Sequence, residues 1–192
     1  HACQHVQLAH VVSPQLLFSN YAYVSGTSSS FVGHFKQYAD WISNSLEIPK
    51  GDLVLEIGSN DCTLLSFLAE SGYRCIGIDP AENIVKDAES NQYLSICSFF
   101  DQEVADDIRK NHGEASLIIA NNVFAHIKDL SKTIQLVSSL LKPSGYLVFE
   151  VSYLLDVIEK TLSDTIYHEH LDYHSVSALL PFLARYGLDV ID

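Results

Sequence analysis

The densest group of chemically active side chains lies at residues 167–174, with the sequence Tyr-His-Glu-His-Leu-Asp-Tyr-His. An imidazole exchanges protons near neutral pH, because the unperturbed pKa of histidine is about 6.5. A carboxylate can orient such an imidazole, and a phenol can donate to an oxyanion or take part in proton transfer. Tyr167, Glu169 and His170 therefore indicate acid–base chemistry, such as the removal of a proton from a substrate.

Two other interpretations of this group stay open at the level of sequence. His170 and His174 are four residues apart, so a helix would place both imidazoles on one face with Glu169 adjacent, as at a metal site. Alternatively, these histidines are solvated side chains on a loop and have a purely structural role.

A second group of candidate residues surrounds Gly58. A strand-like apolar run ends at this glycine and leads into a short polar loop, and a second run over 75–78 ends at Asp79. Glycine lets the backbone come close to a ligand, and an acid at the tip of the next strand can accept hydrogen bonds from two ribose hydroxyls. The pattern predicts a nucleoside-type ligand at the carboxyl ends of two parallel strands.

The composition of this loop favours S-adenosylmethionine over a dinucleotide. A dinucleotide fold uses three glycines to bring the pyrophosphate to a helix N-terminus. Here only Gly58 is present, and Asp61 would oppose the phosphates. Glu56, two residues before the glycine, suits a ligand that carries an amino group and a sulfonium. A dinucleotide, or a tight turn without a ligand, are the remaining alternatives.

Strand-like and helix-like segments alternate along most of the chain. Expected strands cover 53–58, 74–79, 93–97, 116–121 and 146–151, and expected helices cover 31–47, 62–71, 81–90, 101–111, 129–141, 153–162 and 176–186. This alternation predicts an α/β fold, a Rossmann-like parallel sheet with helices on both faces. Residues 1–30 are expected to form an N-terminal arm, and residues 31–192 the ligand-binding domain. Because the chain has no Met and 186–192 look like the start of an unpaired strand, we expect truncation at both ends.

Composition narrows the functional classes. The 192 residues include 24 acidic and 11 basic ones, giving a net charge of −13 that would repel nucleic acid. No run approaches the roughly 20 apolar residues that span a bilayer, and no signal peptide is visible. We expect a cytoplasmic protein with reduced cysteines that binds neither nucleic acid nor membranes. The oligomeric state is not predicted.

The motifs, taken in their order, resemble those of class I S-adenosylmethionine-dependent methyltransferases. Within that superfamily, the chain resembles the C-methyltransferases of deoxysugar biosynthesis. The markers are Glu56 to Asp61, Gly77 to Ala81, Val6-Gln7-Leu8, Tyr21-Ala22-Tyr23, Ser25-Gly26-Thr27-Ser28, Asn122 to Ile127, Phe149-Glu150, Tyr153-Leu154 and Tyr167-His168-Glu169-His170. Where Cys62 stands the family usually has a glycine. Because this position begins an expected helix, a side chain fits there if its torsions are already helical.

The resemblance implies a Rossmann-like class I methyltransferase fold and methyl transfer to a carbon next to a ketone of a nucleotide-linked deoxysugar, through an enolate. It implies His170 as the base, Tyr167 as partner or alternate base, Glu169 as the orienting carboxylate and His126 in the substrate pocket. The implied cofactor-binding residues are Glu56, Gly58, Ser59, Asn60, Asp79, Pro80, Ser98, Phe99, Asn122, Tyr21 and Tyr23. The alternatives are O- or N-methyl transfer by the same fold, or a non-catalytic cofactor-binding module.

The resemblance also implies two flanking parts. Family members carry a small zinc module before the methyltransferase domain, and Cys3 corresponds to its last metal ligand. They also carry a large carboxyl-terminal domain that shapes the sugar nucleotide site. One thiol cannot hold a structural zinc ion, so zinc is expected only in a longer polypeptide.

Overall fold

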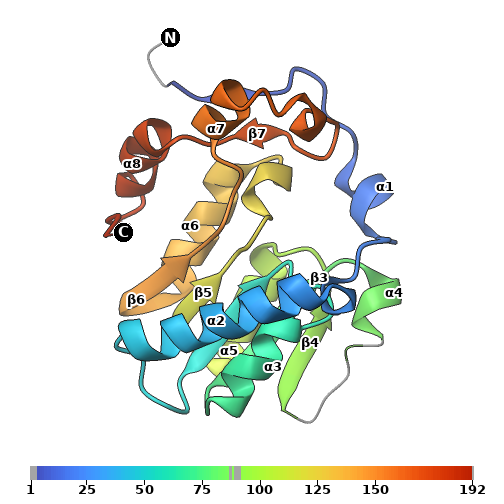
Figure 1. The fold of residues 1–192 in the computed structure, drawn as a ribbon. Helices are drawn as coiled ribbons and strands as arrows, with labels where there is room; N and C mark the ends of the chain where they lie inside the picture. The colour runs from blue at the N-terminus through green and yellow to red at the C-terminus, as the bar shows by residue number, and fades with distance from the viewer. Residues whose placement is uncertain (1–3, 87, 89–91, 192) are drawn as a thin grey trace.

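The computed structural model describes residues 4–86, 88 and 92–191, and its centre is a five-stranded parallel sheet (Figure 1). The strand order is β4-β3-β2-β5-β6. The strands are β2 (Leu53–Ile57), β3 (Arg74–Asp79), β4 (Tyr93–Cys97), β5 (Ala115–Ile119) and β6 (Leu141–Val148). The order reverses between β2 and β5, and ligands of such sheets bind at the carboxyl ends of the strands at this switch point.

The central strands are apolar on both faces, which is typical of a parallel sheet that is covered on both sides. Every residue of β2 and of β5 is buried. Successive side chains of a strand point to opposite faces, so Val54 and Leu55 belong to different core clusters.

Helices pack on each face of the sheet and bury these side chains. The longer helices are α2 (Ser29–Ser45), α3 (Thr63–Glu70), α5 (Gln102–His112), α6 (Leu130–Leu140) and α8 (Val176–Ala184). Phe35 of α2 and Leu65 of α3 contribute to one cluster, whereas Ile108 of α5, Ile134 of α6 and Leu183 of α8 contribute to the other. The sheet therefore lies as a buried layer between two layers of helices.

The N-terminal arm runs along one end of the molecule. Its first strand, β1 (Val6–Gln7), pairs antiparallel with β7 (Asp172–Tyr173). From there the arm passes through α1 (Pro14–Phe18) and the 3-10 turn η1 (Ser25–Thr27) into α2. In Figure 1 it descends from the region of α7 (Leu154–Glu159) and β7, past α1, toward the sheet. The arm thus connects the late segments of the chain with the carboxyl ends of the strands.

Most of the expected elements are confirmed, and four differ. The expected helix 81–90 is described as α4 (Glu82–Val85), and part of its range lies outside the described residues. Strand β6 begins at Leu141 instead of 146. Residues 163–174, where no helix or strand was expected, contain β7 and the 3-10 turn η3 (Ser163–Thr165).

The prediction that a strand begins after residue 186 is wrong for residues 187–191. No strand is assigned there, and Leu188 packs against the core below α8 instead of pairing along a sheet edge. In the described part of the chain, no helix has the length and apolarity required to cross a membrane.

Candidate active site

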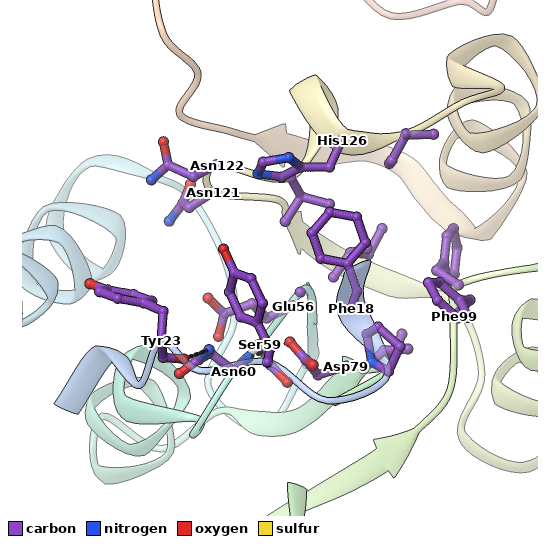
Figure 2. Close-up of a pocket in the computed structure, with 18 of the residues that line it drawn as sticks. Phe18, Tyr23, Glu56, Ser59, Asn60, Asp79, Phe99, Asn121, Asn122 and His126 are labelled. Atoms are coloured by element: carbon purple, nitrogen blue, oxygen red, sulfur yellow. Dashed lines mark hydrogen bonds between the residues drawn. The ribbon is translucent and has the colours of Figure 1, made fainter. Parts of the chain in front are cut away.

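A cavity of about 440 Å³ opens at the carboxyl ends of the strands (Figure 2). Its volume falls in the range that is typical of small-molecule sites. The lining comes from the arm, from the loops after β2, β3, β4 and β5, and from the segment around Tyr167 and His170. The two groups of residues singled out from the sequence, which are far apart along the chain, therefore meet at one site.

The loop after β2 turns tightly at Gly58. This residue has φ +71°, and its amide donates to the carbonyl oxygen of Ile78 at 2.7 Å. A Cβ placed on it would collide with the side chain of Val123. Only glycine meets both demands without strain, because it has no Cβ.

Cys62, at the start of α3, does not meet the condition of right-handed helical torsions under which a side chain was expected to fit. Its φ of 60° and ψ of 22° lie in the left-handed region. Its side chain is fully buried near the hydroxyls of Ser59 and Ser95, and burial raises its pKa to about 11. The residue is therefore an inert thiol in a backbone conformation that favours glycine.

The Asp79 carboxylate organises the loop. One oxygen accepts from the amide of Asn60 at 2.9 Å, and the other accepts from the amide of Ala81 at 2.8 Å. Burial raises the pKa of Asp79, and these two hydrogen bonds act in the opposite direction. Each oxygen keeps a further lone pair, so the carboxylate can still accept hydrogen bonds from a ligand.

Glu56 brings a second acid to the cavity without a counter-charge. The residue is 4% exposed, and its Oε2 has no hydrogen-bond partner in the part of the chain that the structure describes. Burial raises its pKa well above the ordinary value, and the nearby Asp79 and Asp61 raise it further. This environment suits a cationic ligand, which would replace the lost hydration.

The arm is tied to the cavity by hydrogen bonds on both sides. The Asn60 side chain accepts from the Ser25 amide at 2.9 Å and donates to the Tyr23 carbonyl at 2.9 Å. Tyr21 exchanges two backbone bonds with the Asn83 amide group, at 3.1 and 2.8 Å. Together these contacts hold both tyrosines at the cavity, as Figure 2 shows for Tyr23.

Tyr167 and His170 form a hydrogen-bonded pair. The Nδ1 of His170 lies 2.8 Å from the carbonyl oxygen of Thr165, which can only accept, so this nitrogen carries the hydrogen. In the neutral imidazole, Nε2 then has the lone pair, and it accepts from the Tyr167 hydroxyl at 3.2 Å. The hydroxyl hydrogen of Tyr167 therefore points at Nε2 of His170, which can accept it as a base.

His126 lies beside this pair, with its ring centroid 5.1 Å from that of His170. Its Nδ1 donates to the carbonyl oxygen of Glu169 at 2.7 Å. Burial lowers the pKa of His126, whereas the carbonyl groups of Glu169 and Asn122 favour its charged form. The imidazole is therefore fixed in orientation.

Glu169 has a different contact from the expected one. Its carboxylate accepts from the Tyr21 hydroxyl at 3.2 Å, and the orienting contact to the His170 ring comes from the Thr165 carbonyl. Desolvation raises the pKa of Tyr21, and the charge of Glu169 raises it further. Glu169 thus joins the arm to the 167–170 segment.

The remaining candidate residues also line the cavity. These are Gly58, Ser59, Asn60, Pro80, Ser98, Phe99 and Asn122. Asn122 has a left-handed backbone with φ 54°. Cys3, the expected zinc ligand, lies outside the described residues, so that assignment stays a prediction.

The metal interpretation of His170 and His174 finds no support. The segment is not helical, and its short strand β7 ends one residue before His174. Among the residues with described coordinates, no group of three or more His, Cys, Asp or Glu side chains is placed to hold a metal ion.

Sequence reasoning missed several residues at the site. Phe18 lies in the cavity wall and contacts the rings of Tyr21 and His126, and Asn121 lines the wall beside Asn122. An amide at the carboxyl end of an expected strand was a usable signal for Asn121. No local pattern marked Phe18, because its position depends on the path of the arm.

Comparisons with known proteins agree with this architecture. Residues 32–192 match the model of a family described as a methyltransferase domain. The chain is 35% identical over 190 residues to the C-methyltransferase NovU of Streptomyces niveus, an alignment that covers 99% of this chain and 45% of that protein. The chain therefore spans about half the length of this curated relative.

Solved structures share the fold at low sequence identity. A complex between the Trm112 methyltransferase activator of Haloferax volcanii and a methyltransferase matches with a TM-score of 0.68 and 18% identity, covering 87% of this chain and 74% of that one. The magnesium protoporphyrin IX methyltransferase of Synechocystis with bound SAH matches with a TM-score of 0.61 and 18% identity, covering 84% and 74%. The [4+2]-cyclase SpnF matches with a TM-score of 0.62 and 17% identity, covering 82% and 59%.

Proposed function

The chain belongs to the methyltransferase domain family, and from that premise we propose that it binds S-adenosylmethionine in the cavity. The acidic lining supports this ligand. Glu56 is a buried carboxyl without a cationic neighbour among the described ion pairs, so it fits the ammonium group of the cofactor. Asp79 retains acceptor capacity for the ribose hydroxyls, and Ser98 and Phe99 line the wall where the adenine would lie.

We further propose that the acceptor is a carbon next to a ketone of a nucleotide-linked deoxysugar. When bound, the cofactor supplies an electrophilic methyl group on its sulfonium. An acceptor carbon becomes nucleophilic only after it loses a proton, so the chain must supply a base. The Tyr167–His170 pair supports this chemistry, because both residues line the same cavity as Glu56 and Asp79.

The hydrogen-bond pattern supports the pair acting as a single base. The oxygen of Tyr167 removes the proton from the carbon while its own proton moves to Nε2 of His170, and the electron pair of the C–H bond becomes the enolate. The Thr165 carbonyl stabilises the imidazolium through Nδ1. Nε2 of His126 donates a hydrogen bond to the enolate oxygen when the imidazole is protonated. The neutral ring has no hydrogen on Nε2, because its one N–H is at Nδ1 and donates to the Glu169 carbonyl.

One observation carries the proposal: the buried acids Glu56 and Asp79 and the hydrogen-bonded Tyr167–His170 pair line the same cavity. As part of this proposal the reaction takes place in the cytoplasm, where thiols such as those of Cys62 and Cys75 stay reduced. Deuterium exchange at the acceptor carbon tests the base independently of methyl transfer.

The experiment incubates a nucleotide-linked keto-deoxysugar with the protein in deuterium oxide and follows deuterium uptake and methyl transfer by mass spectrometry. Replacing His170 with Gln should slow both by about 100-fold or more, since a positioned base contributes at least that factor. His168→Gln, an exposed neighbour, is the control. Transfer to oxygen or nitrogen without exchange would favour an O- or N-methyltransferase, and cofactor binding with neither reaction would favour a non-catalytic module.

A further inference from the structure

Asn121 occupies the same face of the sheet as Glu56. In the parallel pair β2–β5, Glu56 is the register partner of Ile119, and Asn121 follows Ile119 by two residues. Asn121 lies beyond the end of β5, but the amides of Ala120 and Asn122 still donate to the carbonyl groups of Val148 and Glu150, so the extended pairing continues and side chains two positions apart point to the same face. The α2 residue Tyr38 accordingly donates its hydroxyl to Oδ1 of Asn121 at 3.3 Å, and Tyr38 also lies within the electrostatic influence of Glu56.

The orientation of the Asn121 amide follows from its contacts. Its Oδ1 accepts from the backbone amide of Glu150 at 3.1 Å as well as from Tyr38. A backbone N–H can only donate, so the atom that it meets must be the oxygen. The Nδ2 group with its two hydrogens therefore points away from these partners, and it is buried without a partner of its own among the described residues.

Two unpartnered buried polar atoms thus border one cavity, Oε2 of Glu56 and Nδ2 of Asn121. Figure 2 shows both side chains on the same side of the cavity as Tyr23. Oε2 of Glu56 is an acceptor, and Nδ2 of Asn121 is a donor. The side-chain amide of Asn60, in contrast, already has a partner in the arm for each polar atom, since its oxygen accepts from Ser25 and its nitrogen donates to Tyr23.

We propose that Nδ2 of Asn121 donates to the carboxylate of the amino-acid end of S-adenosylmethionine, opposite the ammonium group at Glu56. An α-amino acid presents a cation and an anion on one carbon, which matches an acceptor and a donor that face one cavity. Leaving a buried donor unsatisfied is costly, and a hydrogen bond to a charged group is stronger than one to a neutral group. The inference rests on the proposed function, because it requires this cofactor in this cavity.

Isothermal titration with two ligands tests the assignment without any turnover. S-adenosylhomocysteine carries the amino-acid end, whereas 5′-methylthioadenosine lacks it. Asn121→Ala should weaken the first ligand by about tenfold or more, as expected for a lost hydrogen bond to a charged group, and leave the affinity for the second unchanged. Asn111→Ala, an exposed amide on α5, is the matched control and should change neither.

A second variant and a third ligand keep the test decisive if Asn121→Ala folds poorly. Asn121→Asp retains an acceptor for Glu150 and Tyr38 but replaces the donor with a carboxylate oxygen, which repels the ligand's carboxylate, so it should show the same selective loss at least as strongly. The wild type should also bind decarboxylated S-adenosylhomocysteine about tenfold or more weakly than the intact ligand. If the Asn121 variants lose the same affinity for S-adenosylhomocysteine and for 5′-methylthioadenosine, or lose none for either, the role of Asn121 is overturned and the proposed function is not. Failure of the wild type to bind any of these ligands overturns the proposed function together with it.

Discussion

At the residue scale, the cavity is built from backbone conformations that ordinary residues avoid. Gly58, Asn60 and Cys62 in one loop, and Asn122 in the facing loop, all have positive φ. Each such non-glycine residue costs on the order of 1 kcal/mol or more, and such residues persist where the surrounding structure over-determines them. Here hydrogen bonds to Asp79 and from the Asn60 side chain supply that constraint.

Cys62 allows the cost of this strain to be measured. At positions with negative φ, a protein with alanine is usually more stable than the same protein with glycine. At φ 60°, as at Cys62, the order should reverse. We expect Cys62→Gly to be more stable than Cys62→Ala by about 1 kcal/mol, with both variants missing the same buried thiol. Chemical denaturation of the two variants gives the difference. A more stable alanine variant would show that the left-handed torsion carries no cost.

Glu56 makes the stability of the ligand-free protein depend on pH. Its pKa is raised in the folded state, so its contribution is fully present below the unfolded pKa of about 4.3 and is lost as the pH rises through the folded pKa. Glu56→Gln cannot titrate. Relative to the wild type, its free energy of unfolding should increase with pH by up to about 1.4 kcal/mol per unit within that window. Thermal unfolding between about pH 5 and pH 8 measures this trend. Glu103→Gln, an exposed acid on α5, is the control, and a difference between Glu56→Gln and wild type that stays flat with pH would contradict the assignment.

At the scale of elements, the arm is the segment whose position depends on the most distant contacts. It pairs with β7 at one end, bonds to Asn83 of α4 in the middle and contacts the loop after β2 through Ser25 and Gly26. The Tyr21 hydroxyl adds the bond to Glu169. Because these partners come from separate parts of the chain, the arm links the loop after β2 to the 167–170 segment.

Removing one hydroxyl tests this coupling. Tyr21→Phe loses the bond to Glu169 and keeps the ring, so amide hydrogen exchange in residues 167–171 should accelerate by roughly fivefold, corresponding to about 1 kcal/mol. Tyr23→Phe is the matched variant, since no hydrogen bond of the Tyr23 hydroxyl occurs within the described coordinates and its backbone carbonyl bond to Asn60 is retained. Equal protection in wild type and Tyr21→Phe would mean that the arm and this segment are held independently.

At the scale of the whole molecule, the sequence predicted the sheet and the tight turn at Gly58 because both follow from local patterns. Apolar runs such as 53–57 and 115–119 end at polar turns, and alternation with helices leaves few topologies. The contacts of Glu169 and the torsions of Cys62 could not be predicted in this way. The first depends on where the arm lies, and the second depends on how the loop closes over β3, and neither is set by neighbouring residues.

The charge of the whole chain gives a further prediction. With 24 acidic and 11 basic residues, the folded protein concentrates like charges, and the described ion pairs are few and partly exposed, so they offset little of this repulsion. Salt shortens the range of the repulsion, from about 30 Å at 0.01 M to about 10 Å at 0.1 M ionic strength. Sodium chloride should therefore raise the Tm at pH 7 by a few degrees. At pH 5, close to the isoelectric point of about 4.9, the same salt should have almost no effect, because the net charge is then near zero. A Tm at pH 7 that falls with salt would instead show that attractive ion pairs dominate, and scanning calorimetry at both pH values distinguishes the two cases.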